Sequence, residues 1–95
     1  MSFLEEYGFD KDEIQEFIDA TPKRIADFIL NNLQLVKDNL GYVKKLVINT
    51  YKEIFINYPD MFLMDTSNFS EMFSKYNTEE LIEKLNANFK MVEYL

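Results

Sequence analysis

Residues 21–41, TPKRIADFILNNLQLVKDNLG, decide the fold of this chain. Apolar residues recur there every three to four positions, which places them on one side of a helix at 100° per residue. They are Ile25, Phe28, Ile29, Leu33, Val36 and Leu40. Pro22 suits a first helical position, because proline lacks the N–H that is unpaired there. We therefore predict one long helix over residues 22–40, capped by Thr21 and ended by Gly41.

The next stretch, residues 42–58, repeats this period. Its inner side carries Val43, Leu46, Val47, Tyr51, Ile54, Phe55 and Tyr58. Its β-branched residues also allow a strand, but the 3.6-residue period and the length favour a second long helix. Pro59 ends it, since the residue before a proline avoids the helical region. The outer side carries a line at i, i+4, i+7 and i+11, formed by Lys45, Asn49, Lys52 and Ile56.

Toward the N-terminus, two short segments have clear end signals. Residues 2–7 predict one turn, with Gly8 in a left-handed conformation and Phe9 touching Leu4, as at a Schellman ending. Asp10 and Glu13 then have capping-box spacing at the start of a short helix. The inner edge of that helix is formed by Ile14, Phe17 and Ile18.

Toward the C-terminus, residues 59–67 form an apolar connector that we expect to pack against the core. Asn68 with Glu71, and Asn77 with Glu80, repeat the capping-box spacing. They predict a short helix with inner residues Phe69, Met72, Phe73 and Tyr76, and a last helix with Leu81, Ile82, Leu85, Phe89 and Val92. The predicted fold class is therefore all-α: a compact bundle of about five helices, three long and two short, with tight connections, in a single helical domain over residues 1–95.

Composition excludes several chemistries. The chain has no Cys and no His, so disulfides, thiolate metal sites and Ser-His-Asp or Cys-His catalysis are impossible. Two Gly leave no phosphate-binding loop of the known types. The densest carboxylate cluster is Asp10, Asp12, Glu13 and Glu16. Gln15 stands where a calcium loop needs Gly, so we interpret these acids as helix-capping groups. We predict a protein that is not an enzyme and has no cofactor or metal.

Charge is unevenly distributed along the chain, whose formal net charge is −7. Residues 1–20 contain seven acids and one Lys, a net −6; residues 21–58 contain three acids and six bases, a net +3; residues 59–95 contain seven acids and three Lys, a net −4. The overall sign disfavours general binding to phosphates. The basic middle either attracts the acidic flanks within one fold or forms a local basic face for an anionic partner.

Two groups of residues are candidate partner contacts. The first is the line Lys45, Asn49, Lys52 and Ile56, extended by Lys44 and Lys37, whose lysines would contact phosphates if the partner were a nucleic acid. The second is an apolar surplus formed by Met61, Phe62, Met64, Met91 and Tyr94. Flexible Met beside aromatic rings suits an adaptable binding groove or a dimer interface. A solvated helix face and ordinary core filling are the alternative interpretations.

One pattern resembles a known family. Leu4, Gly8-Phe9, Ile14, Phe17-Ile18 and Pro22 resemble the helical repeat of the mitochondrial transcription termination factor family. A looser second copy runs through Leu40-Gly41, Ile54-Phe55 and Pro59-x-Met61-Phe62. Membership would imply stacked helical repeats with a basic concave surface on nucleic acid, and at most two repeats fit in this chain.

These patterns lead to three hypotheses of function. The first is a non-enzymatic helical module that binds a protein, with a homodimer as one form, through an apolar and aromatic patch. The second is a nucleic-acid-associated regulator that uses the Lys45 and Lys52 face. The third is an acidic decoy that inhibits a basic nucleic-acid-binding protein. No apolar run approaches 18 residues and no signal peptide is recognisable, so we expect a cytoplasmic protein with no membrane partner.

Overall fold

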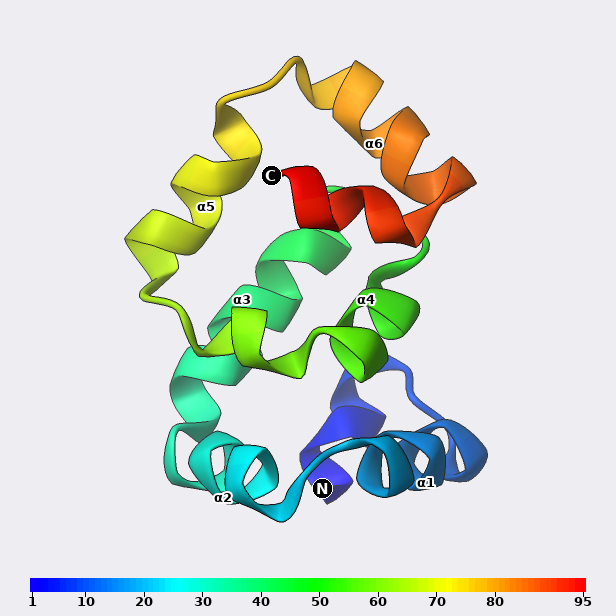
Figure 1. The fold of residues 1–95 in the computed structure, drawn as a ribbon, viewed down its shortest axis with the longest axis vertical. Coiled ribbons are helices and arrows are strands. Elements are labelled where there is room, and N and C mark those ends of the chain that lie inside the picture. Colours follow the sequence, from blue (N-terminus) through cyan, green and yellow to red (C-terminus); the bar gives the residue numbers. More distant parts are fainter.

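The computed structural model describes residues 1–95 as helices joined by turns, with no strand (Figure 1). The α-helices are α1 (Lys11–Ala20), α2 (Lys23–Asn31), α3 (Leu33–Lys45), α4 (Tyr51–Asn57), α5 (Thr66–Ser74) and α6 (Thr78–Ala87). There are also three 3₁₀ segments: η1 (Ser2–Tyr7) before α1, η2 (Pro59–Leu63) between α4 and α5, and η3 (Phe89–Tyr94) after α6. The all-α class is confirmed. The count of about five helices is wrong, because both long central helices are interrupted.

The first interruption is at Asn32, which separates α2 from α3. Asn32 has φ −133° and ψ 42°, outside the helical region. Its side-chain amide donates to the carbonyl of Phe28 at 2.8 Å. Asn side chains compete with the backbone for such bonds and disfavour helix interiors. The apolar period continues across the break and therefore does not reveal it, and Phe28 ends up 53% exposed instead of buried.

The second interruption is a reversal between α3 and α4. Gly41 does not end a helix, since α3 continues through it to Lys45. The reversal comes at Val47, whose φ is +62°. The Val47 N–H donates to the Lys44 carbonyl and the Ile48 N–H to the Val43 carbonyl, at 3.1 and 3.4 Å. These are the two bonds of a Schellman motif. Val47 was predicted on the inner side and is 64% exposed.

The N-terminal segment follows its local signals closely. Gly8 has φ +88°, and the Phe9 N–H donates to the Leu4 carbonyl at 3.2 Å, as predicted. The capping box is present, with Asp10 accepting from the Glu13 N–H and Glu13 accepting from the Asp10 N–H. Thr21 is not a cap. Its hydroxyl donates back to the Phe17 carbonyl at 2.6 Å, and α2 begins after Pro22 without a side-chain cap.

The C-terminal segment follows its signals in part. Asn77 caps α6 by accepting from the Glu80 N–H at 3.0 Å, as predicted. The cap of α5 is Asp65 instead of Asn68, so this helix begins three residues earlier than expected. The last predicted helix is divided into α6 and η3. Asn88 lies between them in an extended conformation and caps η3.

The core contains 18 buried apolar residues from both ends of the chain. A row of phenylalanine rings runs through it, with successive centroids 4.6 to 5.2 Å apart. The rings are Phe17 of α1, Phe55 of α4, Phe62 of η2, and Phe69 and Phe73 of α5. Such pairs each stabilise a fold by about 0.5–1.5 kcal/mol beyond the area they bury. The row therefore connects α1 to α5 across the molecule.

The arrangement in space leaves the two ends of the chain far apart (Figure 1). The N-terminus lies beside α1 and α2 at the bottom of the view, and the last turn of the chain ends between α5 and α6 at the top. None of the helices has the length and apolar character needed to cross a bilayer.

Candidate functional site

The predicted basic line is not one exposed face. Lys45 ends α3 and Asn49 lies in the following turn, both exposed. Lys52 lies on α4 and is half-buried. Ile56, predicted on the outer side, is buried in the core with 8% of its surface exposed. The prediction of a continuous contact line is wrong, because it assumed one helix where the chain reverses at Val47.

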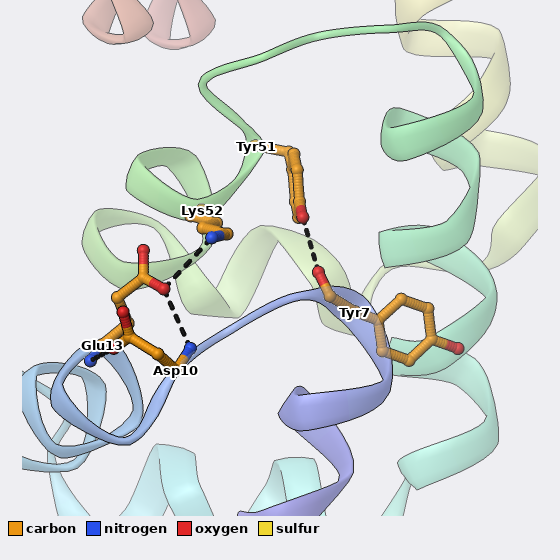
Figure 2. Close-up of polar contacts among 5 residues, drawn as sticks. All are labelled: Tyr7, Asp10, Glu13, Tyr51 and Lys52. Atoms are coloured by element: carbon orange, nitrogen blue, oxygen red, sulfur yellow. Dashed lines mark hydrogen bonds and ion pairs between the residues drawn. The ribbon is translucent and has the colours of Figure 1, made fainter.

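Two lysines of the basic middle segment are paired with acids of the N-terminal flank. Lys52 Nζ lies 3.1 Å from Glu13 Oε1 (Figure 2), and Lys37 Nζ lies 3.9 Å from Glu6 Oε2. The hydrogen bond to Glu13 raises the pKa of Lys52 above its usual value. Both pairs join the segments that were expected to attract each other within one fold. This supports the intramolecular interpretation of the charge pattern over a free basic face.

Figure 2 shows how these contacts fix the N-terminal segment to α4. Glu13 accepts from both Lys52 Nζ and the Asp10 N–H through the same oxygen. The Tyr51 hydroxyl donates to the Tyr7 carbonyl just before the Gly8 turn. Burial, together with the negative charge of Glu6 and Asp38, raises the pKa of the Tyr7 hydroxyl. We call this set of contacts, made by Tyr7, Asp10, Glu13, Tyr51 and Lys52, the N-terminal clasp.

The acidic cluster is divided by the fold. Asp10 and Glu13 are used in the capping box and the clasp. Asp12 and Glu16 lie on the outer face of α1 with Asp19, along an open hollow of about 520 Å³ that has Ala20 as its one apolar lining residue. No group of three or more carboxylates lies close enough together to hold a metal ion.

The apolar surplus is partly core and partly surface. Phe62 is fully buried in the row of rings, so its prediction as a partner contact is wrong. Met61 is half-buried against the core. Met64, Met91 and Tyr94 lie at two neighbouring hollows of about 300 and 130 Å³. The hollows share Leu95 as a lining residue, and the fold thus brings three of the five predicted residues to one surface.

We call this surface the C-terminal face. The larger hollow is lined by Met64, Asn68, Glu71, Met72, Lys75 and Leu95. The smaller one is lined by Tyr76, Leu81, Lys84, Met91, Tyr94 and Leu95. The Tyr76 hydroxyl donates to the Tyr94 carbonyl at 3.3 Å and holds the last turn of the chain against the end of α5. The Tyr94 ring is 78% exposed, the most exposed large apolar side chain of the protein.

Several residues of this face were not predicted as partner contacts from the sequence. Asn68, Glu71 and Met72 of α5 and Lys75 at its C-terminal end follow each other at i, i+3, i+4 and i+7, which places them on one side of the helix. The spacing is visible in the sequence, but Met72 and Tyr76 were assigned to the core side. Tyr76 is in fact 44% exposed. Leu95 lies three positions after Val92 of the predicted inner stripe and was not predicted as a contact; it follows η3 and lines both hollows.

Comparison with known proteins finds no relative of this chain. No protein-family model matches the chain, and neither a curated protein nor a solved structure matches it, so the resemblance to the mitochondrial transcription termination factor family stays a prediction.

Proposed function

We propose that this chain is a non-enzymatic helical module that binds a protein partner through its C-terminal face. The observation that carries the proposal is the meeting of Met64, Met91 and Tyr94, from distant parts of the sequence, at two hollows that share Leu95. Methionine side chains adapt their shape to different apolar partners, and tyrosine contributes a rigid ring at low entropy cost.

Tyr94 is the residue from which we expect the largest contribution. Its ring is 78% exposed in the free chain, so nearly all of its apolar area is available to a partner. Full burial of a large apolar side chain contributes about 1.5–3 kcal/mol. Tyrosine is also enriched among the few residues that dominate binding energy at interfaces. A partner that covers Tyr94 and fills the smaller hollow would gain most of its affinity there.

The two alternative functions draw less support from the geometry. Nucleic-acid binding through Lys52 would first have to break its pair with Glu13. A decoy built on the acidic cluster would lack Asp10 and Glu13, which serve the capping box.

The proposal is tested by selecting random displayed peptides on the immobilised full chain and measuring their affinity for variants. Tyr94→Asp is expected to weaken the selected peptides at least tenfold, since it replaces the exposed ring by a charge. Phe28→Asp is the matched control, because Phe28 is a 53% exposed ring on α2, outside the face. Peptides that bind Tyr94→Asp as tightly as the unchanged chain would contradict the proposal.

Light scattering tests the homodimeric form. If the partner is a second copy, the measured mass rises with concentration from 11.4 kDa toward twice that value, and Tyr94→Asp abolishes the rise. A mass that stays at 11.4 kDa in concentrated solution removes this form and leaves a different protein as the partner.

A further inference from the structure

The charges around the C-terminal face differ from those of the surrounding chain. Residues 59–95 contain seven acids and three Lys. Two of those lysines, Lys75 and Lys84, line the hollows, whereas Glu71 is the one acid that does. The fold therefore does not line this face mainly with carboxylates, although its segment of the chain is acidic. The smaller hollow is mainly apolar and the larger one is mixed, and lysines outnumber acids among their lining residues although the protein is acidic.

Both lysines are exposed and unpaired. The two ion pairs of the protein are made by Lys37 of α3 and Lys52 of α4, with acids of the N-terminal segment. Neither Lys75 nor Lys84 donates a side-chain hydrogen bond to a neighbour. Lys75 comes directly after α5 and borders the larger hollow, and Lys84 lies on α6 and borders the smaller one. Each hollow thus has one free ammonium group beside it.

We infer that the partner segment is acidic: a short stretch of another protein that places a bulky apolar side chain in the hollows and carboxylates against Lys75 and Lys84. This inference rests on the proposed function and names the chemistry of its partner. Opposite charges across an interface fix register and reject wrong partners more than they add affinity. The hollows provide the binding energy, and the two ammonium groups select acidic sequences.

A second copy of the chain fits these two lysines poorly. In a two-fold dimer the face meets itself, so four lysines would be gathered at one interface against two lining acids. Like charges brought together at an interface oppose association. A basic partner segment, which the overall charge of −7 would attract from a distance, meets the same two lysines on arrival.

Selection of displayed peptides on the full chain provides the test, through the composition of the peptides it yields. We expect sequences in which an aromatic or large aliphatic residue is flanked by Asp or Glu. For these peptides, Lys75→Glu combined with Lys84→Glu is expected to weaken binding about tenfold or more, with a steep loss of affinity in salt for the unchanged chain.

The matched control is Lys90→Glu. Lys90 is the third lysine of the same region, is exposed, and lines neither hollow. It changes the net charge in the same direction and is expected to leave affinity within about twofold. Circular dichroism and thermal melts check that all variants remain folded, as expected for exposed positions.

Each outcome has one meaning. Selected peptides that lose binding to Tyr94→Asp but carry Lys, Arg or no charge beside their apolar residue overturn the acidic partner and leave the proposed function standing. An equal effect of Lys90→Glu and the double reversal also overturns it, since the lysine positions would then be irrelevant. Failure to select any peptide that depends on Tyr94 removes both.

Discussion

Two turns of this protein that end helical segments have the same pair of hydrogen bonds, but one has a glycine and the other a valine at the left-handed position. After η1, Gly8 adopts φ +88°, and the Gly8 and Phe9 N–H groups donate to the carbonyls of Glu5 and Leu4. After α3, Val47 adopts φ +62° with the equivalent bonds to Lys44 and Val43. Glycine accepts this conformation freely, whereas a β-branched residue in it is a genuine outlier.

The valine turn persists because its neighbours along the chain are held by the rest of the protein. Ile48, the next residue, is 1% exposed and joins the same core as Val43. Burial of an isoleucine contributes about 1.5–3 kcal/mol, which exceeds the roughly 1–2 kcal/mol cost of one left-handed non-glycine residue. Tertiary bonds also hold the turn: the Asn49 N–H donates to Asn86 Oδ1 at 2.7 Å and the Thr50 hydroxyl to the Leu85 carbonyl at 2.9 Å. A local cost is thus offset by distant contacts.

Gly8→Ala is the substitution from which we expect the largest loss of stability. A Cβ at Gly8 would lie 2.9 Å from the Tyr51 hydroxyl oxygen and would strain the left-handed backbone. We expect a loss of about 2–3 kcal/mol in the free energy of unfolding, measured by urea denaturation, from strain plus the displaced Tyr51 bond. The matched control is Gly41→Ala. A Cβ there lies 3.9 Å from the Tyr7 ring, an ordinary contact, within α3, so stability should rise by about 0.5–1 kcal/mol.

The supporting hydrogen bonds of the two turns can be removed one at a time. Tyr51→Phe deletes the bond to the Tyr7 carbonyl, and Thr50→Val deletes the bond to the Leu85 carbonyl. Each leaves a partly buried carbonyl without its partner, so we expect each to cost about 1–1.5 kcal/mol in denaturant titrations. A negligible effect at Thr50 with a full effect at Tyr51 would mean that the Thr50 bond does not support the valine turn, which leaves the burial of Ile48 and the Asn49 bond to Asn86.

Val47→Gly makes the two turns alike. It relieves the strained backbone and removes a side chain that is 64% exposed, so little burial is lost. Allowing for the greater freedom of glycine in the unfolded chain, we expect a gain of about 1 kcal/mol and a higher melting temperature by calorimetry. Val47→Ala, which keeps a Cβ, is the control and should gain less. A loss of stability in Val47→Gly would show that the valine side chain makes a contact worth more than the strain.

The smallest expected difference between the two turns is in how the melting temperature changes at high pH. At the Gly8 turn, the hydrogen bond to Glu13 raises the pKa of Lys52, and burial raises that of Tyr7. The hydrogen bond to Glu93 raises the pKa of Tyr58. A pKa that is higher in the folded state adds stability below the unfolded value and loses it as the pH rises through the folded value. Melting temperatures should therefore hold constant to about pH 9.5 and fall above about pH 10.

Lys52→Met is the variant that isolates the clasp in this experiment. It removes one of the shifted groups, so its melting temperature should start lower and fall less steeply above about pH 10. Val47→Gly neither adds nor removes a titratable group, so it should follow the same alkaline profile as the unchanged chain. A decline that begins well below pH 9 in the unchanged chain would contradict the assignment to Lys52 and the tyrosines.

The C-terminal face could be predicted from the sequence only in part. Met91 and Tyr94 fell outside the helical stripe of the last predicted helix; Tyr94 is indeed exposed, whereas Met91 is half-buried against the core. Phe62 had the same composition signal and is fully buried, because the connector folds as η2 against the row of rings. Leu95 joins the two hollows only because the chain stops being α-helical at Asn88. Composition therefore indicated an apolar surplus but could not separate its surface members from the core.

The sequence by itself determined the helical class, the Gly8 turn, and the caps at Asp10 and Asn77. The turn and the caps depend on residues within five positions of one another and the helical class on the apolar period, and both are properties of the residue types and their spacing. Only the tertiary structure decided the reversal at Val47 and the placing of Met64 and Tyr94 at neighbouring hollows. The physical reason is one of magnitude: a strained residue costs about 1–2 kcal/mol locally, and burial of side chains far away in the sequence exceeds it.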